Sequence, residues 1–172
     1  MQIFTDRHHY EQSADVMLAK YTDADFVLRQ HAALDRRDIR LLEHSQDGRC
    51  TRIRISYADA PDTDMPYFVR RLVPKQARVV QSIEWDLARK VGRIALDTQG
   101  SPVHIISEMR LSARGNGCLN TTRWQVNCPI LLFGSELEQL LVNTLKQQAR
   151  RARAVVRQLL TESLKEEKPC SL

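Results

Sequence analysis

Several features that mark other protein classes are missing from this sequence of 172 residues. Its four cysteines are far apart, form no CxxC pair and have no histidine at zinc-ligand spacing, so we expect reduced thiols and neither a metal site nor a disulfide framework. No stretch approaches the roughly 18–20 apolar residues that span a bilayer. The charged residues that follow the short segment 1–4 argue against a secretory signal. We therefore expect a cytoplasmic protein.

Motifs for catalysis and for phosphate binding are also missing. The pattern GxxxxGK[ST] does not occur. Ser135 follows Gly134, but the GxSxG frame of a nucleophile elbow is absent. His8 and His9 are adjacent, and on a strand they would point to opposite faces, so they cannot bind one metal together. We predict no catalytic residue, no metal and no cofactor, and we favour a function that is not enzymatic.

The basic character of the chain allows more than one interpretation. The formal net charge is +5, but the arginines are spread over several elements with carboxylates between them, so we expect no specific binding of nucleic acid. The densest basic group lies on one late helix and comprises Lys146, Arg150, Arg151, Arg153 and Arg157. It is either a solvated face whose cations offset the helix dipole or a peripheral contact with an anionic surface through Arg150, Arg151 and Arg153.

Hydrophobic periodicity predicts the order of the elements. A strand over residues 2–9 is followed by two short helices, the first capped by Ser13 and the second by Thr22. Strands are then predicted over 38–44, 49–57, 77–87, 91–98, 103–111 and 118–128. Gly92 predicts a bulge or bend within one of them, and residues 65–69 a short helical lid or loop. Short turns between the strands require antiparallel pairing.

The last helix is predicted to begin at Ser135, which forms a capping box with Glu138. Apolar residues recur at helical spacing after it. About 30 residues at ~1.5 Å each give a helix of ~45 Å, long enough to cross a sheet. We predict one α+β domain over residues 1–167 and a flexible tail over 168–172.

The order strand, two helices, six strands and long helix is the helix-grip order. The sequence resembles the START-like (SRPBCC) superfamily, which includes plant pollen allergens and polyketide cyclases. The resemblance covers nearly the whole chain, and it is carried by residues 77–85, 100–103 and, most specifically, 129–138 (PILLFGSELE). It is strongest to a bacterial branch known only as a domain of unknown function. The resemblance implies a curved antiparallel sheet of about seven strands wrapped around the C-terminal helix, with a cavity for apolar molecules between them.

The inward rows of the predicted strands and one face of the helix supply the candidate cavity residues. The apolar candidates are Ile53, Ile55, Val79, Ile83, Trp85, Ile94, Leu96, Ile105, Met109, Trp124, Leu141, Leu145 and Ala149. The polar candidates, which could orient a ligand, are Gln81, Ser107, Asn120 and Thr122. Core packing is the alternative for each apolar residue, and a water or backbone partner is the alternative for each polar one.

Three functional hypotheses follow. The first is non-catalytic binding or transport of a hydrophobic, lipid-like small molecule in the cavity. The second is a cyclase- or hydrolase-like enzyme acting on an apolar substrate there. The third is an interaction module that uses the basic face of the last helix. The ligand and the oligomeric state stay open at this point.

Overall fold

A computed structural model describes residues 1–58, 78–129 and 134–166. The elements are β1 (Gln2–Tyr10), α1 (Ala14–Tyr21), α2 (Ala24–Ala33), β2 (Arg37–Asp47), β3 (Cys50–Ala58), β4 (Arg78–Asp86), β5 (Val91–Thr98), β6 (His104–Arg114), β7 (Gly117–Asn127) and α4 (Gly134–Glu166). The strands pair in the order β1-β7-β6-β5-β4-β3-β2, and every pair is antiparallel. The predicted α+β helix-grip order is confirmed. The loop predicted over 65–69 and the tail 168–172 lie outside the described residues.

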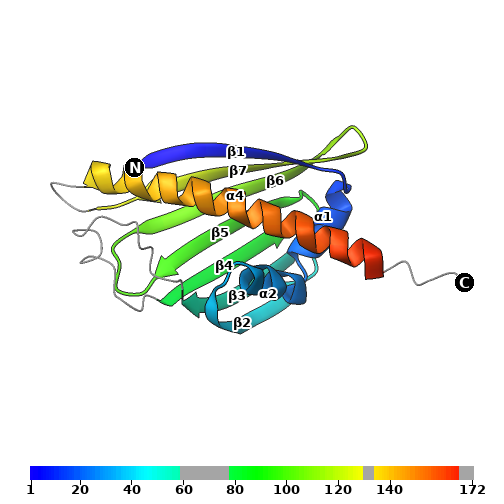
Figure 1. Cartoon of the computed structure of the whole chain (residues 1–172), viewed down its shortest axis with the longest axis horizontal. Coiled ribbons are helices and arrows are strands. Elements are labelled where there is room, and N and C mark those ends of the chain that lie inside the picture. Colours follow the sequence, from blue (N-terminus) through cyan, green and yellow to red (C-terminus); the bar gives the residue numbers. More distant parts are fainter. Residues whose placement is uncertain (59–77, 130–133, 167–172) are drawn as a thin grey trace, which may run out of the picture.

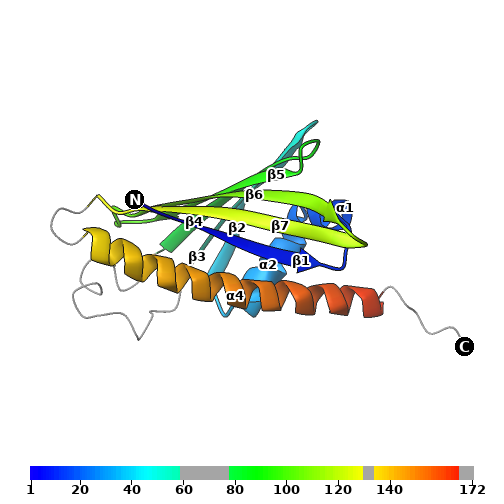
Figure 2. The same ribbon diagram turned by 90° about the horizontal axis from the view of Figure 1, so that it is seen from above.

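Helix α4 runs along one face of the curved sheet, and the other helices lie toward the end of the sheet near the C-terminal half of α4 (Figure 1). Viewed from above, α4 lies on a single side of the sheet (Figure 2). We call the face toward α4 the inner face. None of the helices in the described ranges is both long and apolar enough to cross a membrane.

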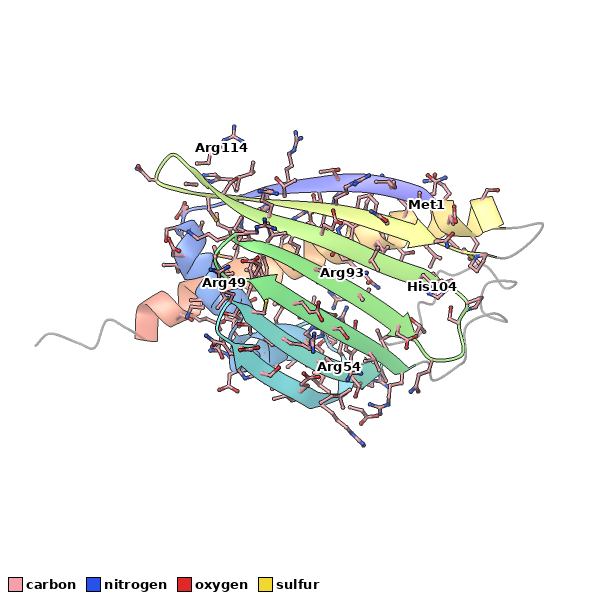
Figure 3. All side chains as sticks on the ribbon, turned by 180° about the vertical axis from the view of Figure 1, so that it is seen from behind. Met1, Arg49, Arg54, Arg93, His104 and Arg114 are labelled. Carbon is pink, nitrogen blue, oxygen red and sulfur yellow. The ribbon has the colours of Figure 1, made fainter. Side chains whose placement is uncertain are left out.

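The alternation along the strands sets which residues face α4. On β4, the residues Val79, Gln81, Ile83 and Trp85 are all at most 8% exposed, whereas Glu84 is exposed. The opposite face of the sheet carries polar and charged side chains, among them Arg93 (Figure 3). Because side chains alternate between the two faces of a strand, the sequence predicted this assignment correctly.

The two short helices are capped as their sequences require, with one correction. Ser13 caps α1, and its side chain accepts a hydrogen bond from the Val16 backbone N–H over 3.3 Å. Asp23, and not Thr22 as predicted, caps α2, where it accepts from the Asp25 N–H over 3.0 Å. The Thr22 hydroxyl instead donates to the Leu18 carbonyl over 2.8 Å, so Thr22 ends α1.

Gly92 does not produce the predicted bulge. The pairing of β5 with β4 and with β6 is continuous through this residue. Its inward position is opposite Trp85 and Met109, and a Cβ atom there would lie 2.7 Å from the Trp85 indole. Glycine is therefore needed for the close approach of that ring. The register shifts occur instead in β2, at the edge of the sheet, where a bulge also discourages pairing with another chain.

Glu138 connects α4 to the sheet and to the start of the chain. The helix begins at Gly134, one residue before the prediction. Glu138 is only 4% exposed, and its carboxylate accepts from the Cys128 backbone N–H over 2.9 Å and from the Met1 ammonium group over 2.8 Å. These two bonds, the one to the ammonium group first, lower the pKa of Glu138. Glu138, predicted as part of a capping box, thus anchors the start of α4 through its bonds to Cys128 and Met1.

Candidate functional site

A cavity of about 130 Å³ lies between the inner face of the sheet and the helices. Strands β1, β4, β5, β6 and β7 form its base, and side chains of α1, α2 and α4 border it on the opposite side. On α4 it is bordered by Ala149 and Ala152, whose small side chains leave space below the helix. The predicted location, between sheet and C-terminal helix, matches the position of this cavity.

More than half of the predicted cavity residues border this space. They are Gln81, Ile83, Trp85, Ile94, Met109, Asn120, Thr122, Trp124 and Ala149. All of them except Ala149 stand on the inward rows of β4 to β7, which follows from the alternation of those strands. Ala149 lies on the side of α4 that faces the sheet.

The remaining predicted residues pack in the core away from the cavity wall. Ile53, Ile55 and Val79, with Leu96 beside them, belong to the main core cluster. Ile105, Leu141 and Leu145 pack around Val126 beneath the first half of α4. Ser107 is fully buried. In the region of Val126 the large side chains fill the space that the sequence had assigned to a ligand.

Several residues that border the cavity were not predicted. Those on the sheet are Asp6, His8 and Tyr10 of β1, and those on the helices are Tyr21, Val27, Gln30, Ala152, Arg153 and Val156. A signal for the first group was present in the sequence. Phe4 and Tyr10 share a face of β1 with Asp6 and His8, because all four positions have the same parity, and the aromatic pair identifies that face as the inner one.

The cavity has one apolar and one polar side. Ile83 and Ile94 of β4 and β5, with Met109 of β6, form the more apolar side, and Val27 of α2 and Val156 of α4 add to it; Gln81 of β4 and Gln30 of α2 also border the cavity. The polar side is formed by neighbouring β1 and β7 together with one side chain of α4. Its residues are Asp6, His8, Asn120, Thr122 and Arg153. The site can therefore orient a molecule that has one apolar and one polar end.

Four of the residues that border the cavity have a buried polar atom without a hydrogen-bond partner within the described part of the chain. The atoms are His8 Nε2, Asn120 Oδ1, Trp85 Nε1 and Trp124 Nε1. Burying such a group without a partner costs about 1–3 kcal/mol. These atoms are accordingly the ones that a bound molecule, or water, would satisfy.

Arg153 is the exception to the predicted solvated basic face, whose other members Lys146, Arg150, Arg151 and Arg157 are exposed. Its side chain is 22% exposed and forms an ion pair with Asp6 of β1 at the polar side of the cavity. Arg151 is paired as well, with Asp35 over 2.7 Å. The physical reason is helical spacing, because Arg153 follows Ala149 by one turn and therefore shares its face. The predicted contact surface of Arg150, Arg151 and Arg153 is thus divided between two sides of α4.

Burial shifts the pKa values of three side chains that border the cavity. Burial lowers the pKa of His8, and the positive charges of Arg157 and His9 lower it further. The His8 imidazole is therefore neutral near pH 7. Burial also raises the pKa of Tyr10 and of Tyr21, whose hydroxyls form a hydrogen bond of 3.0 Å. Both phenols remain protonated.

The side chain of Gln81 is oriented by a second polar cluster, which consists of Tyr57, Arg36 and His31. The Tyr57 hydroxyl donates to Gln81 Oε1 over 3.2 Å. The Arg36 guanidinium lies 4.0 Å from the centroid of the Tyr57 ring, and the centroid of the His31 ring lies 4.9 Å from it. Burial, with the charge of Arg36, lowers the pKa of His31 to about 3. The cluster fixes the orientation of one cavity amide with neutral groups and one arginine.

No group of three or more metal-ligating side chains is found within residues 1–58, 78–129 and 134–166. The three cysteines in those ranges, Cys50, Cys118 and Cys128, are free thiols.

Comparison with known proteins supports the fold. The model of a family described as "Protein of unknown function (DUF2505)" matches residues 5–160. No curated protein sequence matches this chain significantly. Three solved structures illustrate the likeness.

The structure of Ara h 8.0201 has a TM-score of 0.64 at 10% identity, and the match covers 93% of this chain and 98% of that chain. The Zhui aromatase/cyclase from Streptomyces sp. R1128 has a TM-score of 0.61 at 13% identity, over 99% of both chains. A START superfamily protein from Mycobacterium smegmatis has a TM-score of 0.57 at 13% identity, over 91% of this chain and 98% of that chain. At such identities the likeness shows the fold alone, and it confirms the resemblance to START-like proteins.

Proposed function

This chain belongs to the DUF2505 family of proteins of unknown function and has the START-like fold, and on that premise we propose that it binds a hydrophobic small molecule in the cavity between the sheet and α4. In this proposal the bound molecule is carried or sensed and is not converted. The observation that supports it is a cavity of about 130 Å³ that is bordered by the sheet and the helices, with apolar side chains on β4, β5 and β6 and polar ones on β1 and β7.

The size of the cavity limits the ligand. A dry cavity of about 150 Å³ lined by apolar side chains is large enough to bind benzene. The cavity here is close to that size but carries polar groups on one side. A compact molecule, of about the size of one substituted ring, is the ligand that fits it.

The proposal is tested by extraction and by filling the cavity. Protein purified under native conditions is extracted, and the extract is identified by mass spectrometry. Ala149→Phe places a ring in the cavity and should abolish recovery of the molecule. Ala154→Phe is the matched control, because Ala154 lies five residues further along α4 with its side chain exposed. If the extract of the wild type holds no small molecule, or if both variants retain it equally, the proposal is wrong.

A cyclase- or hydrolase-like reaction in the same cavity is the second candidate, and His8 is the observation that favours it. A neutral imidazole whose Nε2 atom is buried without a partner could take a proton from a bound substrate. Incubation of the extracted molecule with the protein separates the two candidates. A carrier returns it unchanged, whereas an enzyme converts it at a rate that falls in His8→Gln.

A further inference from the structure

Two unpartnered atoms lie opposite each other at the polar side of the cavity. His8 of β1 and Asn120 of β7 are directly paired in the strand register, which places their Cβ atoms about 4.5–5.5 Å apart. Both residues border the cavity. Asn120 is 8% exposed, and within the described part of the chain neither its Oδ1 atom nor His8 Nε2 has a hydrogen-bond partner.

The chemistry of these atoms selects the group that would satisfy them. Asn120 Oδ1 can only accept, so its partner must donate. His8 Nε2 accepts or donates according to the tautomer of the ring. A hydroxyl is the smallest group that can donate to one atom and serve the other in either role. We propose, on the basis of the proposed function, that the ligand is a compact ring compound whose uncharged hydroxyl binds between Asn120 Oδ1 and His8 Nε2.

The two groups that would contact the ligand at this position carry no positive charge, which disfavours an anionic ligand. Arg153, the cation that borders the cavity, is already paired with Asp6. Arg157 lies close enough to His8 to lower its pKa, as does His9, and burial lowers it more than either of them. The neutral imidazole and the Asn120 carbonyl oxygen offer a carboxylate no compensating charge. A neutral polar group avoids the cost of burying an ion without a counterion.

The apolar part of the molecule then has a defined place. From Asn120 and His8 the inner face continues across the sheet to Met109 on β6 and to Ile94 and Ile83 on β5 and β4. A ring that reaches across these strands would contact apolar side chains on the sheet and Ala149 and Ala152 on α4. The indole N–H groups of Trp85 and Trp124 remain available to a second neutral oxygen.

The proposal is tested with three probes that share one apolar part: 4-ethylphenol, ethylbenzene and 4-ethylbenzoate. Binding is followed by the indole N–H signals in nuclear magnetic resonance spectra. The chain has only two tryptophans, and both border the cavity, so each signal reports directly on occupancy. We expect 4-ethylphenol to bind about ten-fold more tightly than ethylbenzene, which corresponds to the net contribution of one or two hydrogen bonds. 4-Ethylbenzoate should bind more weakly than either.

Substitution locates the hydroxyl. Asn120→Leu keeps the approximate size of the side chain but removes one of the two partners of the hydroxyl, so the preference for 4-ethylphenol over ethylbenzene should fall. Asn127→Leu, on the exposed side of the same strand, should retain the ten-fold preference. His8→Phe provides an independent variant if Asn120→Leu does not fold, and it should reduce the preference as well.

Each outcome decides between the proposals. If ethylbenzene and 4-ethylphenol bind equally to the wild type, the hydroxyl site is wrong while hydrophobic binding stands. If 4-ethylbenzoate binds most tightly, the polar side recognises an anion and the inference is overturned. If Asn120→Leu retains the full ten-fold preference, the hydroxyl lies elsewhere. Failure of all three probes contradicts the hydroxyl site, and the mass-spectrometric extraction then decides separately whether the proposed function also fails.

Discussion

Two neighbouring rows of residues, one on the inner and one on the outer face of the sheet, lie only one position apart along each strand. A row on the inner face joins Thr51, Trp85, Gly92, Met109, Thr122 and Asp6 in register. The row beside it on the outer face joins Arg52, Glu84, Arg93, Glu108 and Arg123 in register, with charges of alternating sign. All five side chains of the outer row are exposed. This row of the outer face, which includes the Arg93 labelled in Figure 3, is thus a ladder of opposite charges.

The two rows stabilise the fold through different interactions. Exposed cross-strand pairs of opposite charge contribute about 0.2–1 kcal/mol each and depend little on shape. The inner row depends on fit, because the Trp85 ring occupies the space that a side chain at position 92 would need. Substitutions at neighbouring positions should therefore have very different effects on the free energy of unfolding.

The largest contrast is expected between Trp85 and Glu84. Trp85→Ala removes a ring that is 2% exposed and should lower the free energy of unfolding by about 3–5 kcal/mol. Glu84→Ala breaks a 2.8 Å ion pair with Arg52 whose side chains are about half exposed, and it should cost at most about 1 kcal/mol. Chemical denaturation of both variants measures the difference. Equal losses would show that the outer ladder is as important as the core.

The next contrast concerns added volume. Gly92→Ala introduces a Cβ atom 2.7 Å from the Trp85 indole and 2.9 Å from the Met109 methyl group, and it should destabilise the protein by about 1–3 kcal/mol. Arg93→Ala, the next residue on the outer face, is the control and should change stability by less than about 0.5 kcal/mol. A stable Gly92→Ala variant would mean that the indole can shift without cost.

Glu138 extends the comparison to a buried carboxylate. Glu138→Ala leaves the buried Cys128 N–H without its acceptor and should cost about 1–3 kcal/mol near neutral pH. Because folding lowers the pKa of Glu138, its contribution is present above the ordinary glutamate pKa of about 4.3 and is lost as the pH falls through the lower, folded-state pKa. Unfolding curves over this pH range should show the gap between wild type and variant closing. The exposed Glu108→Ala should show a much smaller gap, and a Glu138 gap that is independent of pH would contradict the assignment.

The smallest expected effect is a difference between two ion pairs. Asp6–Arg153 is mostly buried, with side chains 28% and 22% exposed, whereas Arg52–Glu84 is about half exposed. Double-mutant cycles should give a coupling energy of about 1–2 kcal/mol for the first pair and about 0.2–1 kcal/mol for the second. Added salt should reduce the second more than the first. Equal coupling would indicate that the Asp6–Arg153 pair is hydrated.

The alternation of side chains explains why so much of the sheet was predictable. On β4 and β7 the inward rows could be read from the sequence because each position fixes the face of the next. Gly92 left the register of β5 open, since glycine has no side chain to show which face it occupies. The pairing of Gly92 with Trp85 and Met109 in the sheet shows that it belongs to the inner face.

The errors also have physical causes. Thr22 and Asp23 are adjacent and both can cap a helix, so the choice depended on where α1 ends. Leu141, Leu145 and Ala149 lie on one apolar stripe of α4. The sequence of that stripe does not show that Ala149 borders the cavity whereas Leu141 and Leu145 pack in the core. Arg153 was assigned to solvent by its charge, yet the helix brings it over β1, where Asp6 offers a partner.

The sequence by itself determined the order of the elements, the face of most strand residues and the long helix that covers the sheet. These features follow from local periodicity and from caps and turns. Only the tertiary structure decided where the space under α4 is filled, around Val126 and Leu145, and where it stays open, below Ala149 and Ala152. A cavity is the volume left between side chains from distant segments, so its place and its unpartnered polar atoms arise only when those segments pack together.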